Sequence, residues 1–324
     1  MNDLVTKARA ISTPAPQPTL TINPVTLPAP GRGRPLDLRI TAPISGDHLP
    51  IILLSHGHGP SLYIPSKDGY GPLVDFYAAH GFVVIQPTHA NSKVAGLGKD
   101  TPGYPFFWQS RLDDMTLILD SLSAIEQAVP LLAGRLDASR VAAVGHSLGG
   151  QTVGMLLGAG LTDTADPAVT RVRQPEPRIK AGVLLAAPGL GGDSLSDYAR
   201  ANYTTLNPDF STLTTRTLVV AGDADDSPHL TTRGAEWHVD PYRHAPGAEA
   251  LLTLFGGKHG LGGIAGYDAK ETDDEDPERL AITQRLTLAY LRTALDIDGS
   301  SWPEAMAALE AHAPDVGRAD FKTA

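Results

Sequence analysis

Short runs of consecutive apolar residues recur along the chain, and segments with helical spacing of apolar positions separate them. Runs of this length that are wholly or mainly apolar are typical of strands that helices cover on both faces. The runs that predict such strands are 51–54, 82–85, 141–144, 182–186, 217–221 and 251–255, and we expect the last of them to be the final strand. Residues 36–41 alternate between apolar and polar side chains, which predicts a half-exposed strand.

The segments between these runs predict helices over 71–80, 107–129, 149–159 and 277–295. Strands that alternate with helices over this length predict an α/β fold with a mostly parallel sheet, helices on both faces and right-handed crossovers. The acidic run 273–276 precedes Pro277. We interpret this run as an N-cap that complements the helix dipole, with a cation site as the alternative.

Residues 11–35 hold many prolines and few charges, which predicts an extended entry segment or edge strands. We therefore expect residues 1–35 to form an extended N-terminal segment. Residues 36–324 are predicted to form a single domain. Three irregular stretches within it, near 161–179, 189–214 and 227–249, are longer than ordinary connections. They are candidates for lids or pocket walls.

Composition narrows the classes of function. The chain has 42% hydrophobic and 19% charged residues, which is typical of a soluble globular protein. Its net charge of −10 disfavours nucleic acid and anionic membrane surfaces as partners. The absence of cysteine excludes disulfides, thiolate catalysis and cysteine-ligated metals. No run approaches the ~18 apolar residues of a membrane span and the N-terminus lacks the apolar core of a signal peptide, so we expect a cytoplasmic protein.

The strongest chemical signal is the segment Gly145-His146-Ser147-Leu148-Gly149, which ends an apolar run abruptly. A serine at the tip of a tight strand-to-helix turn sits in strained backbone geometry, and the neighbouring chain approaches closely two residues before and two after it. Gly145 and Gly149 leave room for that approach. The pattern therefore predicts a nucleophile elbow, with a glycine-rich turn that happens to hold a serine as the alternative.

A second segment, Ser55-His56-Gly57-His58-Gly59, directly follows the buried run 51–54. Its glycines let a backbone N–H face the site, so we assign oxyanion-hole donors to the amides of His58 and Leu148. The two histidines also suggest metal ligands, although no carboxylate or third histidine follows at a recognisable spacing. A structural role for His56 is the other interpretation.

An acid and a base follow two later strands. The loop Gly222-Asp-Ala-Asp-Asp-Ser-Pro228 offers a carboxylate that can orient a histidine, and Asp223, Asp225 and Asp226 are the candidates. The loop Gly256-Gly-Lys-His-Gly260 carries His259 between glycines that leave it free to reach across the site. A surface histidine and an acidic turn are the alternatives for these two loops taken singly.

Serine, acid and histidine occur in the chain order of an α/β-hydrolase. Over residues 36–295 the sequence resembles that superfamily, and within it the chlorophyllase, dienelactone hydrolase and platelet-activating-factor acetylhydrolase-like group. The resemblance implies Ser147 as nucleophile, His259 as base, the amides of His58 and Leu148 as oxyanion donors, and Asp225 as acid, since it stands at the Gly-x-x-Asp offset from Gly222. It departs from dienelactone hydrolases in its serine nucleophile, and from secreted members in lacking a leader and disulfides.

The resemblance implies a serine carboxylic-ester hydrolase that needs no cofactor or metal and acts on a small-molecule ester with an apolar part. Acyl transfer, or thioester or amide hydrolysis, by the same triad is an alternative, as is a noncatalytic binding protein. The aromatic residues at 104–108 are equally suited to an acyl pocket and to core packing. The same two interpretations apply to Trp237.

Overall fold

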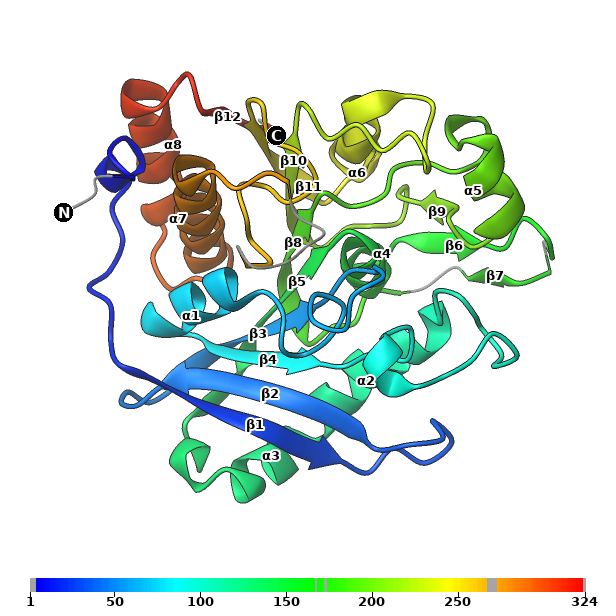
Figure 1. The fold of residues 1–324 in the computed structure, drawn as a ribbon. Coiled ribbons are helices and arrows are strands. Elements are labelled where there is room, and N and C mark those ends of the chain that lie inside the picture. The colour runs from blue at the N-terminus through cyan, green and yellow to red at the C-terminus, as the bar shows by residue number, and fades with distance from the viewer. Residues whose placement is uncertain (1–3, 167, 172–173, 267–272, 323–324) are drawn as a thin grey trace.

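The apolar runs form the centre of one mixed sheet. The computed structural model describes residues 4–166, 168–171, 174–266 and 273–322, and within them the sheet has nine strands in the order β1-β2-β4-β3-β5-β8-β10-β11-β12 (Figure 1). The central strands run parallel from β4 to β11. They are β4 (Val83–Pro87), β3 (Leu49–Ser55), β5 (Leu136–His146), β8 (Ile179–Leu185), β10 (Arg216–Gly222) and β11 (Ala248–Leu254). The expected α/β fold with a mainly parallel sheet is confirmed.

Antiparallel strands complete both edges of the sheet. On one side β2 (Leu36–Pro43) pairs with β4, and β1 (Thr19–Leu27) pairs with β2. On the other side β12 (Gly317–Phe321) pairs with β11. The expectation that the run 251–255 is the final strand was therefore wrong, because the chain returns to the sheet once more after two further helices.

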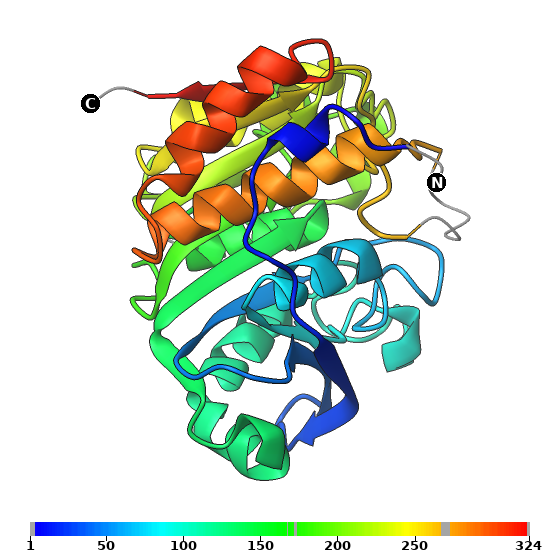
Figure 2. The same ribbon diagram turned by 90° about the vertical axis from the view of Figure 1, so that its left-hand side faces the viewer.

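Helices cover both faces of the sheet. One face packs against α1 (Gly71–Ala79), α7 (Pro277–Ala294) and α8 (Ser301–His312), and Figure 2 shows α7 and α8 lying across it. The other face packs against α2 (Trp108–Asp120), α3 (Leu122–Ala128), α4 (Leu148–Leu156) and α6 (Asp240–His244). Alternate residues of β3 enter the two cores, Ile52 one and Ile51 the other, because successive strand side chains point to opposite faces.

Two of the predicted helices differ in how far the structure follows the prediction. The segment 107–129 breaks at Ser121, whose backbone leaves helical geometry, so it forms α2 and α3 instead of one helix. The acidic run before α7 provides the N-cap, because the Asp276 side chain accepts a hydrogen bond from the Arg279 amide and Pro277 occupies the first turn. The N-cap interpretation of that run is confirmed.

The three long stretches are more regular than expected. Short strands β6 (Gly160–Thr162), β7 (Thr170–Arg171) and β9 (Pro208–Asp209) form a small second sheet. A short helix, α5 (Asp197–Asn202), and a 3₁₀ helix (Gly234–Val239) lie in the other two stretches. Positions 167, 172 and 173 of the first stretch lie outside the described residues.

The N-terminal segment joins the fold at two places. Residues 19–27 form the edge strand β1, and a 3₁₀ turn (Ala8–Ala10) contacts α7 and α8. Residues 1–3 of the N-terminus considered above lie outside the described part of the chain. Among the helices that are described, none has both the length and the apolar character needed to cross a bilayer.

Candidate active site

Ser147 lies between the end of β5 and the start of α4 in a strained conformation. Its φ is 54° and its ψ is −122°, a region that non-glycine residues rarely occupy. A Cβ on Gly145 would lie 2.1 Å from the Gly149 carbonyl oxygen, and a Cβ on Gly149 would lie 2.0 Å from that of Ser55. The two glycines are therefore required by close backbone approach, as the elbow pattern predicts.

Two backbone amides near Ser147 are free to bind an anion. Leu148 begins α4, where a helix leaves its first N–H groups without an internal partner. Among the described residues, neither the Leu148 nor the His58 amide donates a hydrogen bond to another group of the protein. Both residues line the same cavity as Ser147. The assignment of these two amides as oxyanion donors stays a prediction.

Asp225 and His259 form a hydrogen-bonded pair across the ends of β10 and β11. His259 Nδ1 donates to Asp225 Oδ2 at 2.8 Å. Asp225 is buried, and its other oxygen accepts a hydrogen bond of 3.2 Å from the Ser227 hydroxyl. Burial alone would raise the pKa of Asp225, but the neighbouring imidazole of His259 outweighs it and lowers the pKa to about 2. Burial correspondingly lowers the pKa of His259, but the Asp225 charge and hydrogen bond outweigh that and raise it above 6.5.

The other two aspartates of this loop have different surroundings. Asp223 Oδ1 accepts a hydrogen bond of 2.6 Å from the Gly256 amide, which ties the loop after β10 to the loop after β11. Asp226 is exposed. Only Asp225 of the three contacts His259.

Ser147, Asp225 and His259 line one cavity of about 360 Å³. In the described part of the chain, the Ser147 hydroxyl makes no hydrogen bond with the His259 ring. Such contacts are often long in ligand-free enzymes and tighten when substrate binds. The structure thus brings the three residues together and joins two of them directly.

The loop that carries His259 is fixed on both sides. The buried Asp274 carboxylate accepts hydrogen bonds from the Lys258 amide at 2.7 Å and the Gly262 amide at 3.2 Å. His146 Nε2 donates to the carbonyl oxygen of His259 at 2.8 Å. These bonds hold the backbone of the histidine loop while its side chain remains partly exposed.

His146 also reaches the loop after β3. Its Nδ1 accepts a hydrogen bond of 2.8 Å from the Tyr70 hydroxyl, whose oxygen accepts one of 3.0 Å from the Gly57 amide. The carbonyl oxygen at Nε2 fixes a proton on that nitrogen. Burial lowers the pKa of His146 to about 3, so the ring is neutral and Nδ1 is the accepting nitrogen. A neutral histidine therefore connects the loop of His259 to the loop of His58.

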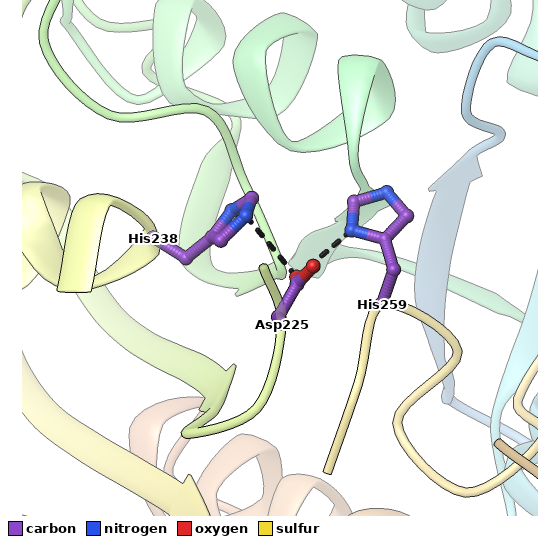
Figure 3. A group of neighbouring side chains, drawn as sticks. All are labelled: Asp225, His238 and His259. Atoms are coloured by element: carbon purple, nitrogen blue, oxygen red, sulfur yellow. Dashed lines mark hydrogen bonds and ion pairs between the residues drawn. The ribbon is translucent and has the colours of Figure 1, made fainter. Parts of the chain in front are cut away.

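A second histidine contacts Asp225. Figure 3 shows the Asp225 carboxylate between the imidazoles of His238 and His259. His238 Nε2 lies 3.2 Å from Asp225 Oδ2, while its Nδ1 donates to the carbonyl oxygen of Ala187 at 2.9 Å. Burial lowers the pKa of His238, with Asp225 opposing it. Nothing in the sequence around this residue had indicated a role.

These three residues are also where a metal ion would have ligands. One ligand atom each from Asp225, His238 and His259 lies within 4.8 Å of the other two. The Nδ1 proton of His259 already occupies this space, so a metal would displace it. His56 is not available as a metal ligand, because its Nδ1 bonds the Gly57 carbonyl oxygen and its Nε2 accepts from the His89 amide. This geometry favours the structural interpretation of His56.

The aromatic residues left open by the sequence divide between the cavity and the core. Phe106 lines the cavity, together with Tyr203 and Leu206 from the second long stretch and Leu230 from the third. Trp237 is fully buried and its Nε1 donates to the Leu190 carbonyl oxygen. The second and third stretches therefore contribute walls to the cavity.

No protein-family model matches this chain, and a search among curated proteins finds no similar sequence.

Proposed function

We propose that the protein has the α/β-hydrolase fold and is a serine carboxylic-ester hydrolase. One observation carries the proposal: the buried Asp225 holds the His259 imidazole at 2.8 Å in the cavity where Ser147 sits at the strained end of a strand. The order of the three residues along the chain and their positions after β5, β10 and β11 support it. So does the resemblance of the sequence to the chlorophyllase and dienelactone hydrolase group.

In the first half of the reaction, His259 Nε2 takes the proton of the Ser147 hydroxyl as the oxygen attacks the ester carbonyl carbon. The carbonyl oxygen becomes an oxyanion that the amides of His58 and Leu148 stabilise. Asp225 keeps the Nδ1 proton on His259 and stabilises the imidazolium. The tetrahedral intermediate then expels the alcohol, which takes its proton from His259, and leaves an acyl group on Ser147.

In the second half, a water molecule gives a proton to His259 as it attacks the acyl carbon. The intermediate collapses, the carboxylic acid leaves, and the proton returns to Ser147. The protein groups supply nucleophile, base and oxyanion stabilisation between them, so the mechanism requires no cofactor.

The shape of the cavity suits a small ester with an apolar part. A volume of about 360 Å³ lies at the low end of the range for small-molecule sites. Phe106, Leu206 and Leu230 contribute apolar wall, and the polar lining includes Asp226, His229, Lys258 and Asp273. We expect the apolar part of the substrate to contact Phe106, Leu206 and Leu230.

The first prediction tests the nucleophile. We expect a fluorophosphonate probe to label Ser147, and Ser147→Ala to lower the turnover of p-nitrophenyl esters by a factor of about 10⁶ while the fold is retained. The control is Ser139→Ala, at the opposite end of β5, which should retain both labelling and turnover. Mass spectrometry measures the labelling, and initial rates measure the turnover.

The absence of an adduct on folded wild-type protein would instead favour a noncatalytic binding protein. A separate experiment distinguishes hydrolysis from acyl transfer by the products formed with an added alcohol or amine.

A further inference from the structure

A fully buried arginine lies beside the loop and the helix that carry the two candidate oxyanion amides. Arg111, on α2, has no exposed surface and donates hydrogen bonds in four directions. The acceptors are the Thr152 hydroxyl at 2.7 Å, the Ser55 hydroxyl at 2.9 Å, the His56 carbonyl oxygen and the Asn91 side-chain oxygen. These acceptors belong to three separate segments of the chain, because Ser55 and His56 are neighbours, and one guanidinium connects the three.

One branch leads to the Leu148 amide. Arg111 Nε donates to the hydroxyl of Thr152, and that hydroxyl donates to the Leu148 carbonyl oxygen at 3.1 Å. The first turn of α4 is therefore tied to the guanidinium through a single side chain.

The other branch leads to His58. Arg111 Nη2 holds the carbonyl oxygen of His56, two residues before it. Arg111 Nη1 holds the side-chain oxygen of Asn91, which leaves the Asn91 amino group to donate to His58 Nδ1 at 3.3 Å. The backbone and the side chain of the His58 loop are both tied to the guanidinium.

A buried chain of hydrogen bonds leads from Arg111 to a carboxylate. Ser55 donates to His89 Nε2 at 3.0 Å, and His89 Nδ1 donates to Asp114 at 2.9 Å. Asp114 also pairs with Arg32 at 2.6 Å. Burial lowers the pKa of Arg111, with Asp114 opposing it, to about 9, so the guanidinium is charged at neutral pH.

Ser55, His89 and Asp114 have the residue types of a catalytic triad, but they are not a second active site. Ser55 and His89 have no exposed surface, and Asp114 is 2% exposed. No substrate can reach this serine, whose hydroxyl oxygen already accepts from Arg111. The array instead links the guanidinium to the Asp114 carboxylate, which also pairs with Arg32.

We propose that Arg111 is the positioning residue of the oxyanion hole, fixing the distance between the His58 and Leu148 amides from a buried point behind both. This inference rests on the proposed function, because it assigns the two amides a common role in the transition state. Hydrogen-bond donors that stabilise the charge developing in the transition state act mainly on kcat. A misplacement of about 1 Å can lower kcat about 10²-fold. Arg111 touches no substrate and acts only through its neighbours.

The experiment compares two substitutions of Arg111 with a matched arginine elsewhere. We expect Arg111→Met to lower kcat about 10²-fold and Arg111→Lys about 10-fold, with KM changing less than about 3-fold. Binding of a trifluoromethyl ketone, which forms an oxyanion on Ser147, should weaken in parallel with kcat. Binding of the corresponding alcohol should not weaken.

The control is Arg135→Met, which removes hydrogen bonds to the carbonyl oxygens of Gly46, Leu131 and Pro43 at the opposite end of the sheet. It should lower thermal stability and leave kcat unchanged.

The branch to Leu148 is tested separately by Thr152→Val, which keeps the shape of the side chain and removes both of its hydrogen bonds. We expect about a 10-fold loss of kcat in the wild-type background and no further loss in Arg111→Met, because both changes break the same connection. Wild-type kcat and ketone affinity in Arg111→Met, or fully additive losses in the double variant, would overturn the inference. If neither Arg111 variant folds, unchanged kcat in Thr152→Val overturns it and a loss of kcat at constant KM supports it.

Failure of the proposed function has a different signature, since wild-type protein would then neither turn over esters nor bind the ketone. The inference about position can still be read without turnover from amide NMR signals. Of the Leu148 and His58 amide signals, Thr152→Val should shift only that of Leu148, whereas Arg111→Lys should shift both. An Arg111→Lys spectrum with both signals unmoved would contradict the inference.

Discussion

Three aspartates within one loop differ in what their carboxylates contact, and this difference makes a prediction about single residues. Asp225 is buried against His259, Asp223 holds the Gly256 amide, and Asp226 faces solvent. We expect Asp225→Asn to lower kcat by about 10⁴-fold, since an amide can hold the histidine in the wrong tautomer. Asp226→Asn should change kcat little, and Asp223→Asn should act mainly through stability.

The measurement is kcat for the three asparagine variants, with circular dichroism to check folding. If kcat fell strongly in Asp226→Asn and stayed near the wild-type value in Asp225→Asn, the acid would have been assigned to the wrong residue. A triad with Asp226 as its acid would then remain.

The pH profile gives a second prediction at this scale. The Asp225 charge and hydrogen bond raise the pKa of His259 above 6.5, and the base must be neutral to accept the serine proton. The kcat/KM of the wild type should therefore fall as pH decreases through a value above 6.5. In Asp225→Asn the negative charge is gone while burial remains, so the pKa of His259 should lie below that of the wild type. NMR titration of His259 in Ser147→Ala, with and without Asp225→Asn, measures this shift, and a profile flat down to pH 5 would exclude a histidine base.

Residues that sit in a local pattern could be found from the sequence, and residues that act through distant contacts could not. Ser147 and His259 stand between glycines directly after apolar runs, so their neighbours along the chain mark them. Arg111 lies in an ordinary helical segment, and its four acceptors come from other parts of the chain. His238 likewise gains its contact with Asp225 only when the third long stretch folds over the site.

At the scale of elements, the packing of α4 against β3 gives a prediction with an internal control. A Cβ on Gly149 would lie 2.0 Å from the backbone oxygen of Ser55, which cannot move without opening the sheet. We expect Gly149→Ala to lower the free energy of unfolding by about 3 kcal/mol or more and to reduce kcat with it. Gly154 lies in the same helix, where a Cβ would meet only the Ala159 side chain at 4.0 Å. Gly154→Ala should leave stability unchanged or raise it by up to about 1 kcal/mol, because alanine is the better helix former.

Urea denaturation of both variants measures these free energies. Equal effects of the two substitutions would show that helix propensity, and not close packing on β3, controls this position.

Elements with a strong hydrophobic pattern were predictable, and elements stabilised by pairing were not. Each apolar run lies in a strand of the sheet because helices cover both of its faces, although the boundaries moved by a few residues. Strand β12 has no such run, and it is held by tertiary contacts such as its pairing with β11 and the packing of α8. The short strands β6, β7 and β9 depend on each other in the same way.

For the whole molecule, the sequence determines that the site lies at one edge of the sheet but leaves the strand order open. Parallel strands place the loops that follow them at their shared carboxyl edge, so Ser147, Asp225 and His259 could be expected near one another. The order of the strands depends on which pairs form, and that is a tertiary property. The same is true of the N-terminal segment, which crosses the molecule to reach the last helices (Figure 2).

The anchor of this N-terminal segment gives the last prediction. The Glu278 carboxylate, in the first turn of α7, accepts hydrogen bonds from the amides of Lys7 at 2.8 Å, Ala8 at 3.0 Å and Thr6. Ala8 and Ile11 are fully buried behind it. Glu278→Ala should loosen this segment, lower the free energy of unfolding by about 1–2 kcal/mol and make the segment more sensitive to proteases. Turnover should not change, because the segment does not line the cavity.

The pH dependence separates this effect from a general loss of stability. Burial would raise the pKa of Glu278, but the backbone amides outweigh it and hold the pKa below its ordinary value of 4.5. The stabilisation is therefore present above about pH 4.5 and is lost as pH falls through the lowered pKa of the folded state. Urea titrations of wild type and Glu278→Ala should give free energies that converge at low pH, whereas Glu310→Ala, at an exposed site on α8, should match the wild type throughout. A difference between wild type and Glu278→Ala that is constant with pH would show that the carboxylate charge does not hold the segment.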